Sequence, residues 1–246
     1  MRAVSSLGIK IYADGADLQT MREMYRKPWI RGFTTNPTLM RRAGVSDYRA
    51  FAIDVLRAIP DRPISFEVFS DEFEEMAQQA REIASWGPNV FVKIPVTNTR
   101  GESSANVIRD LAVTGIRVNV TAILGLDQVR DMIRALEGGS PAYVSVFAGR
   151  VADTGRDPVP LVAAAVELAR LAPNVEVIWA SPRELLNIYQ ADAVGCQIIA
   201  VTNDILGKLD LVGKDLGAYS LETVQMFRND ALQAGYSLPE RTKTSV

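Results

Sequence analysis

Lys93 has the placement that carbonyl chemistry requires of a lysine. It stands near the end of the apolar run Asn89-Val90-Phe91-Val92-Lys93-Ile94-Pro95-Val96, which is typical of a buried strand. Burial disfavours the charged ammonium, so such a lysine is expected to have a lowered pKa. A neutral amine attacks carbonyl carbon, and Lys93 is therefore a candidate for Schiff-base chemistry. The alternative is a lysine that ends a strand with its ammonium in solvent.

The chain contains no histidine, and this excludes whole classes of mechanism. Ser-His-Asp and Cys-His triads cannot form, nor can histidine-ligated metal sites. Acid–base work must fall to carboxylates, lysine, tyrosine or water. The single cysteine, Cys196, lies in an apolar run and cannot form a disulfide within the chain, so we expect it to pack in the core.

Composition and charge indicate a soluble globular protein. Hydrophobic residues make up 48% of the chain and charged residues 23%, while the net charge is only −2 without a basic block. Neither nucleic acid nor an anionic membrane is therefore an expected partner. We find no signal peptide and no apolar stretch of about 20 residues, so we expect a cytoplasmic protein without membrane spans.

Eight β-branched apolar runs alternate with segments of helical periodicity. The runs cover residues 9–13, 30–34, 64–69, 90–93, 117–121, 142–147, 175–180 and 197–201. Eight such repeats in 246 residues predict an α/β protein, a (β/α)8 TIM barrel forming one domain over residues 1–246. A further helix near 220–235, within an extension of about 218–238, has Leu221, Val224, Phe227 and Leu232 on one side. It must pack on the barrel or on a neighbouring subunit.

Polar residues gather where the predicted strands end, which is where such barrels build their sites. They are Asp14, Thr34, Asn36, Glu67, Lys93, Asn119, Thr121, Arg150, Ser181 and Arg183, and the aromatic residue Phe147 is a further candidate among them. Singly, each has a structural alternative: Asp14 as a helix N-cap, Asn36-Pro37 as a helix start, Glu67–Lys93 as an ion pair, and the arginines as surface residues. These alternatives do not explain the convergence on one rim. No dinucleotide or P-loop motif is present.

These segments resemble the transaldolase family, and within it the short branch that includes fructose-6-phosphate aldolase. The resemblance spans about residues 9–238. The matching motifs are Tyr12-Ala13-Asp14, Thr34-Thr35-Asn36-Pro37, Val92-Lys93-Ile94-Pro95-Val96-Thr97, Asn119-Val120-Thr121, Phe147-Ala148-Gly149-Arg150, Ala180-Ser181-Pro182-Arg183, Gly213-Lys214-Asp215-Leu216 and Ser220-Leu221-Glu222-Thr223-Val224.

The resemblance implies a role for each residue. Lys93 would form an imine with C2 of a ketose phosphate, and Asp14 would take the C4 hydroxyl proton during cleavage of the C3–C4 bond. Glu67 and Thr121 would position a proton-shuttling water, while Asn36 and Asn119, beside Thr34 and Phe147, would hold the three-carbon unit.

The resemblance also implies an anion site. Arg150, Ser181 and Arg183 would bind the phosphate. Pro182 departs from the aromatic residue expected there and removes one backbone N–H, which leaves the nature of the anionic group open. No metal or organic cofactor is implied.

Two positions bear on whether the reaction is transfer or cleavage. Fructose-6-phosphate aldolases resemble this chain but carry glutamine at position 67 and tyrosine at position 147, where this chain has Glu67 and Phe147. The resemblance thus implies transfer of dihydroxyacetone from fructose 6-phosphate or sedoheptulose 7-phosphate to glyceraldehyde 3-phosphate or erythrose 4-phosphate, in the pentose phosphate pathway, by a homo-oligomer. The alternatives are an aldolase-like lyase, a donor with another anionic group, and an inactive barrel with a binding role.

Overall fold

The protein folds around a closed barrel of eight parallel strands, which confirms the predicted (β/α)8 class. The computed structural model describes residues 4–238. The strands are β1 (Lys10–Asp14), β2 (Ile30–Thr34), β3 (Ile64–Glu67), β4 (Val90–Pro95), β5 (Val118–Ile123), β6 (Ala142–Val146), β7 (Val175–Trp179) and β8 (Ile198–Thr202). Their ends differ from the predicted ones by two residues or fewer. Each strand pairs with the next, and β8 closes on β1.

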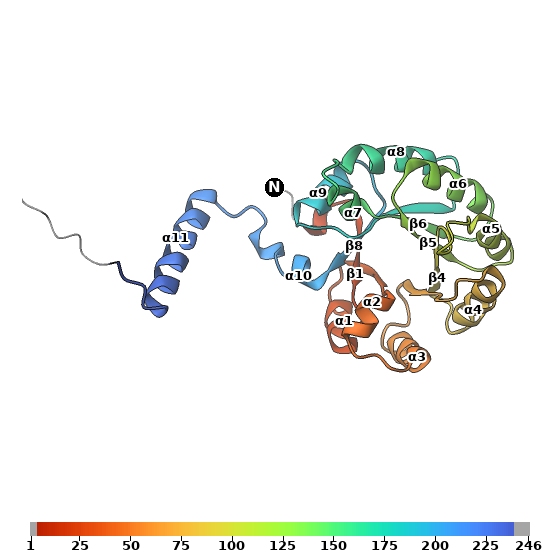
Figure 1. Cartoon of the computed structure of the whole chain (residues 1–246), viewed down its shortest axis with the longest axis horizontal. Coiled ribbons are helices and arrows are strands. Elements are labelled where there is room, and N and C mark those ends of the chain that lie inside the picture. Colours follow the sequence, from red (N-terminus) through yellow and green to blue (C-terminus); the bar gives the residue numbers. More distant parts are fainter. Residues whose placement is uncertain (1–3, 239–246) are drawn as a thin grey trace, which may run out of the picture. The chain divides into compact units, whose positions relative to one another are not determined.

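Helices follow the strands and surround the barrel (Figure 1). They are α1 (Leu18–Tyr25), α2 (Pro37–Arg42), α3 (Tyr48–Ala58), α4 (Phe73–Ser85), α5 (Ala105–Val113), α6 (Leu126–Leu136), α7 (Ala148–Ala152), α8 (Val159–Ala169), α9 (Leu186–Ala193) and α10 (Asn203–Leu206). Short 3-10 helices occupy Val4–Ser6 and Leu209–Leu211. Within residues 4–238, no helix is long and apolar enough to cross a membrane.

The described chain divides into two compact units, one ending at Leu209 and one beginning at Asp210. The first contains all eight strands. The second contains α11 (Leu216–Gln233), which begins two residues before the predicted extension of about 218–238 and otherwise overlaps it. Asp215 caps this helix, since its carboxylate accepts a hydrogen bond of 2.9 Å from the Ala218 N–H.

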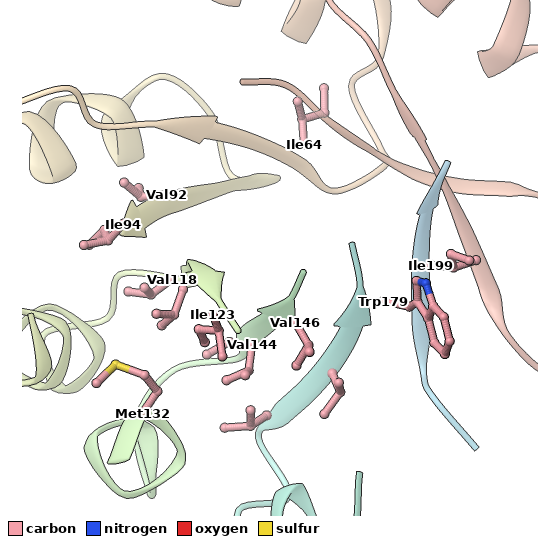
Figure 2. Packing of buried hydrophobic residues seen from close by; sticks show 14 of the residues in the cluster. Ile64, Val92, Ile94, Val118, Ile123, Met132, Val144, Val146, Trp179 and Ile199 are labelled. Atoms are coloured by element: carbon pink, nitrogen blue, oxygen red, sulfur yellow. The ribbon is translucent and has the colours of Figure 1, made fainter. Parts of the chain in front are cut away.

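Alternation along the strands sends side chains either outward to the helices or inward to the barrel. The outward set, which includes Val92 and Ile94, packs with helix side chains such as Met132 of α6 to form a large apolar core (Figure 2). The inward set is smaller and partly aromatic. Tyr12 of β1 and Tyr143 of β6 are joined by a hydroxyl–hydroxyl hydrogen bond of 2.8 Å, and because these strands are not neighbours this contact crosses the barrel interior.

A glycine makes room for this aromatic layer. A Cβ atom on Gly32 of β2 would lie 2.5 Å from the Tyr12 ring, so no larger residue fits without displacing it. Phe91 of β4 stacks on the Tyr143 ring with centroids 4.0 Å apart. The aromatic rings therefore fill the middle of the barrel and form a floor below its carboxyl-terminal mouth.

Residues two positions beyond this floor face the same interior at the mouth. Asp14 stands two residues after Tyr12, and Lys93 stands two residues after Phe91. Glu67, Lys93 and Asn119 are side by side in register on β3, β4 and β5. The strand period thus places Asp14, Glu67, Lys93 and Asn119 above an aromatic floor.

Candidate active site

Lys93 lies inside the barrel mouth rather than in solvent. Its side chain is only 9% exposed. The ammonium nitrogen lies 3.5 Å from Glu67 Oε2 and donates a hydrogen bond of 2.8 Å to the Thr35 carbonyl. Both contacts orient Nζ toward the β2–β3 side of the mouth.

Two carboxyl groups share this space with Lys93. Asp14 accepts a hydrogen bond of 2.7 Å from Thr34 Oγ1, and it does not cap a helix, because Asp17 caps α1. Burial raises the pKa of Asp14 above its ordinary value, although the Lys93 charge and the Thr34 hydrogen bond act in the opposite direction. Carboxyl groups that hold their protons more tightly are suited to proton transfer near neutral pH.

Glu67 is the second of these carboxyl groups. Burial is again the main reason that the pKa of Glu67 is raised, and the charge of Asp14 raises it further, while Lys93 lowers it. Asp14, Glu67 and Lys93 therefore form one electrostatically coupled group. The predicted Glu67–Lys93 ion pair is present, but it belongs to this group rather than standing alone.

Asn119 is held rigidly beside Lys93. It is fully buried, its Nδ2 donates to Ser65 Oγ at 3.0 Å, and its Oδ1 accepts from Ser145 Oγ at 2.7 Å. Thr121 follows on the same inward face of β5 and is 2% exposed. The next residue, Ala122, has a φ of 64°, which is a strained backbone for a residue with a side chain.

Asn36 has the structural role that the sequence offered as an alternative. Its Oδ1 accepts a hydrogen bond of 3.0 Å from the Leu39 N–H and caps α2, with Pro37 at the first helical position. The NH2 group of Asn36 remains as a donor on the rim. Capping and ligand binding are thus compatible for this side chain.

The predicted anion-binding residues form a second group on α7 and on the turn between β7 and α9. The Arg150 guanidinium lies 5.3 Å from the Phe147 ring centroid. Arg183 makes a bidentate ion pair with Asp153, in which Nε lies 3.0 Å from Oδ1. Three of its five N–H groups remain for a ligand.

Close packing joins the two segments of this second group. A Cβ atom on Gly149 would lie 1.6 Å from the Ser181 carbonyl oxygen, so only glycine allows α7 to approach the turn. Ser181 itself has a φ of 61°. The turn is fixed by Asn187 Oδ1, which accepts hydrogen bonds from the Arg183 and Glu184 N–H groups at 2.8 and 3.1 Å.

Comparison with known proteins gives this arrangement a context. A model of the Transaldolase/Fructose-6-phosphate aldolase family matches residues 11–244. The chain belongs to this family. It is 34% identical over 199 residues to a "Probable transaldolase" of Dehalococcoides mccartyi, covering 80% of this chain and 88% of the relative. A "Probable transaldolase" of Pelotomaculum thermopropionicum is 35% identical over 211 residues, or 85% and 92% of the two chains.

Family membership supports the conclusion that the chain is an enzyme, whereas similarity to distant structures bears only on the fold. The crystal structure of 2,3-dimethylmalate lyase, a PEP mutase/isocitrate lyase superfamily member, superposes with a TM-score of 0.55 at 10% identity. The match covers 99% of this chain and 93% of that structure.

Some residues of this transaldolase-family site were missed by sequence reasoning. Ser65 and Ser145, which flank Asn119, are polar residues at inward strand positions, so strand alternation alone would have found them. The contact from Lys93 to Thr35 uses a backbone carbonyl, which carries no side-chain signal. Asp153 reaches Arg183 from the end of α7, and this contact is set by tertiary structure.

Proposed function

We propose that this chain is a transaldolase that carries a dihydroxyacetone unit as an imine on Lys93. The observation that supports this most directly is a buried lysine amine within 3.5 Å of one carboxyl group and coupled to another, where burial raises the pKa of both carboxyl groups. Such a set supplies a nucleophile and proton-transfer groups without histidine.

The reaction begins when Lys93 Nζ adds to C2 of the donor ketose. Loss of the C2 oxygen as water gives the protonated imine. Asp14 then takes the C4 hydroxyl proton, the C3–C4 bond breaks, and its electron pair moves into the imine to give an enamine. The aldehyde product leaves. An acceptor aldehyde forms a new C–C bond with C3, takes its proton from Asp14, and water then hydrolyses the imine.

The remaining residues have supporting roles in this proposal. Glu67 and Thr121 hold the water that moves protons during imine formation. Asn36 and Asn119 hydrogen-bond the three-carbon unit until the acceptor binds. Asn119 is well suited to this role because two serine hydroxyls fix its amide. Thr34 orients Asp14 through the hydrogen bond of 2.7 Å.

The anionic end of the donor binds Arg150, Ser181 and Arg183. The substrates we propose are fructose 6-phosphate and sedoheptulose 7-phosphate as donors, and glyceraldehyde 3-phosphate and erythrose 4-phosphate as acceptors. Asp153 holds Arg183 before the anion arrives. Pro182 supplies no N–H, so a donor with another anionic group is the alternative substrate.

Transfer is favoured over net cleavage by the residues at two positions. Glu67 is a carboxylate rather than an amide, and Phe147 lacks a phenol, so the enamine is not readily protonated and persists until an acceptor arrives. A lyase releasing free dihydroxyacetone is the second candidate. We further propose a cytoplasmic homo-oligomer assembled through α11, which carries Leu221, Val224 and Phe227.

A transfer assay tests this function. Fructose 6-phosphate labelled with carbon-13 at C1 is incubated with enzyme and erythrose 4-phosphate, and labelled products are followed by NMR. The proposal predicts labelled sedoheptulose 7-phosphate with little free dihydroxyacetone, and none of either with Lys93→Met. Free dihydroxyacetone as the main product would replace the transferase with the lyase, and no turnover by wild type would refute both for these donors.

A further inference from the structure

The ladder between β2 and β3 stops one step before the active-site carboxylate. Its last bond runs from the Thr35 N–H to the Ser65 carbonyl at 3.2 Å. One further step of the parallel pattern would pair the Glu67 N–H with the Thr35 carbonyl, and the Glu67 carbonyl with the N–H of residue 37. Residue 37 is a proline without an N–H, so the second bond cannot form.

A side-chain hydroxyl replaces both missing partners. The Glu67 N–H donates to Tyr48 Oη at 2.8 Å, and the Tyr48 hydroxyl donates to the Glu67 carbonyl at 2.7 Å. An N–H and a C=O of one extended residue point to the same edge, so a single hydroxyl can serve as acceptor and donor there. Tyr48 opens α3, where Asp47 caps the helix through the Ala50 N–H at 2.9 Å.

The use of the Tyr48 hydroxyl in place of backbone partners has a consequence for Lys93. Because the Glu67 N–H is taken by Tyr48, the Thr35 carbonyl is left to accept the Lys93 ammonium at 2.8 Å. The same hydroxyl holds the Glu67 backbone in register with Lys93, where the two side chains approach to 3.5 Å. The placement of both charged groups therefore depends on one hydrogen-bonding atom outside the barrel interior.

Packing fixes that atom. The Tyr48 ring lies edge-on to Phe69 and tilted to Trp86, with centroids 5.7 Å away in both cases, and it also contacts Phe66 at 6.4 Å. These contacts use the ring and not the hydroxyl. Tyr48→Phe would therefore keep the aromatic cluster and remove only the two hydrogen bonds to Glu67.

We propose that Tyr48 is a positioning residue for the Lys93 site, whose hydroxyl ends the β2–β3 ladder early and so directs the Thr35 carbonyl to Lys93. This role rests on the proposed function. Without the hydroxyl, the Glu67 N–H loses its acceptor and can only share the Thr35 carbonyl with Lys93, so the hydrogen bonds of both groups become weaker. Misplacement by about 1 Å can slow a reaction about 100-fold, so we expect imine formation to slow by about 10- to 100-fold.

The test compares Tyr48→Phe with Tyr25→Phe as a matched control. The Tyr25 hydroxyl donates to Asp61 at 2.7 Å, so the control also loses one tyrosine hydrogen bond, but away from the barrel mouth. The rate of borohydride-trapped adduct formation with fructose 6-phosphate is measured for each variant, alone and with Glu67→Gln. We expect slowing by Tyr48→Phe alone, with a smaller effect when Glu67 is already replaced.

Hydrogen exchange gives a readout that does not depend on catalysis. The Glu67 amide should exchange faster in Tyr48→Phe and at the wild-type rate in Tyr25→Phe. Wild-type trapping by Tyr48→Phe, equal slowing by both variants, or unchanged exchange at Glu67 would each overturn the role. If wild type itself forms no adduct, the proposed function fails and this role with it, while exchange at Glu67 still reports whether the hydroxyl holds the strand.

Discussion

Replacing Asp14 by asparagine should make the protein more stable and less active. Burial raises the pKa of Asp14 in the folded state, so the folded protein binds this proton more tightly than the unfolded chain does. As pH rises from the unfolded value of about 3.9 through the raised folded value, the free energy of unfolding therefore falls. Asparagine does not ionise and avoids this loss.

The size of the effect on the free energy of unfolding is proportional to the pKa shift. Each unit by which the folded pKa exceeds the unfolded one corresponds to about 1.4 kcal/mol of stability lost by wild type above both values. In a chain of this length, that is roughly 3–6 °C in Tm per unit. The Thr34 hydroxyl can still donate to the asparagine oxygen, so the hydrogen bond at Asp14 survives. Transfer activity should fall by about 100- to 10,000-fold because the general base is lost.

Urea unfolding from pH 3 to pH 8, beside a transfer assay at pH 8, measures both effects. Asp17→Asn is the control, because hydrogen bonds from Thr20 lower the pKa of Asp17 and its charge stabilises the fold above the unfolded pKa. That variant should be slightly less stable than wild type at pH 8 and should converge with it at low pH. An Asp14→Asn protein less stable than wild type at pH 8, or a gain that does not shrink toward pH 3, would refute the reasoning.

Three other substitutions test the anion site, the choice between transfer and cleavage, and the hydrogen bonds around Asn119. Gly149→Ala forces a Cβ atom to within 1.6 Å of the Ser181 carbonyl, so kcat/KM for phosphorylated donors should fall at least about 10-fold, with imine formation from dihydroxyacetone retained. Phe147→Tyr should increase the fraction of cleavages that release free dihydroxyacetone, measured by enzymatic assay. Asn119→Ala leaves two buried serine hydroxyls without their partner and should lower the free energy of unfolding by about 1–3 kcal/mol, measured with urea.

Each outcome has an opposite that would count against the account. Equal losses with phosphorylated and unphosphorylated compounds in Gly149→Ala would separate that glycine from anion binding. An unchanged product ratio in Phe147→Tyr would remove this position from the choice between transfer and cleavage. Wild-type stability of Asn119→Ala would mean that the serines find other partners.

The barrel was predictable because its signal is repeated along the chain. Each strand is a short β-branched run, and eight of them must close with their carboxyl ends on one face. That rule, together with the strand period, also brings Glu67, Lys93 and Asn119 into register. The cap of α3 is similarly local, because Asp47 accepts a hydrogen bond from the Ala50 N–H three residues later.

Other features depend on contacts that no local pattern encodes. The pairing of Arg183 with Asp153 joins the turn between β7 and α9 to the end of α7, which lies about 30 residues earlier in the sequence. Tyr48 belongs to the apolar stripe of α3 in the sequence, and only the early end of the β2–β3 ladder shows what its hydroxyl does. The acceptor for Lys93 is a backbone oxygen, so side-chain identities carry no trace of it.

Intact-mass spectrometry after incubation with fructose 6-phosphate and borohydride tests the imine at Lys93 most directly. Wild type should gain the mass of one reduced dihydroxyacetone unit, located on Lys93 by peptide mapping. Lys93→Met should gain nothing, whereas Lys10→Met, which removes a lysine paired with Glu176 at the other end of the barrel, should be labelled like wild type. Adding erythrose 4-phosphate before the borohydride should discharge the adduct. Labelling that persists in Lys93→Met, or that is absent from wild type, would contradict the account.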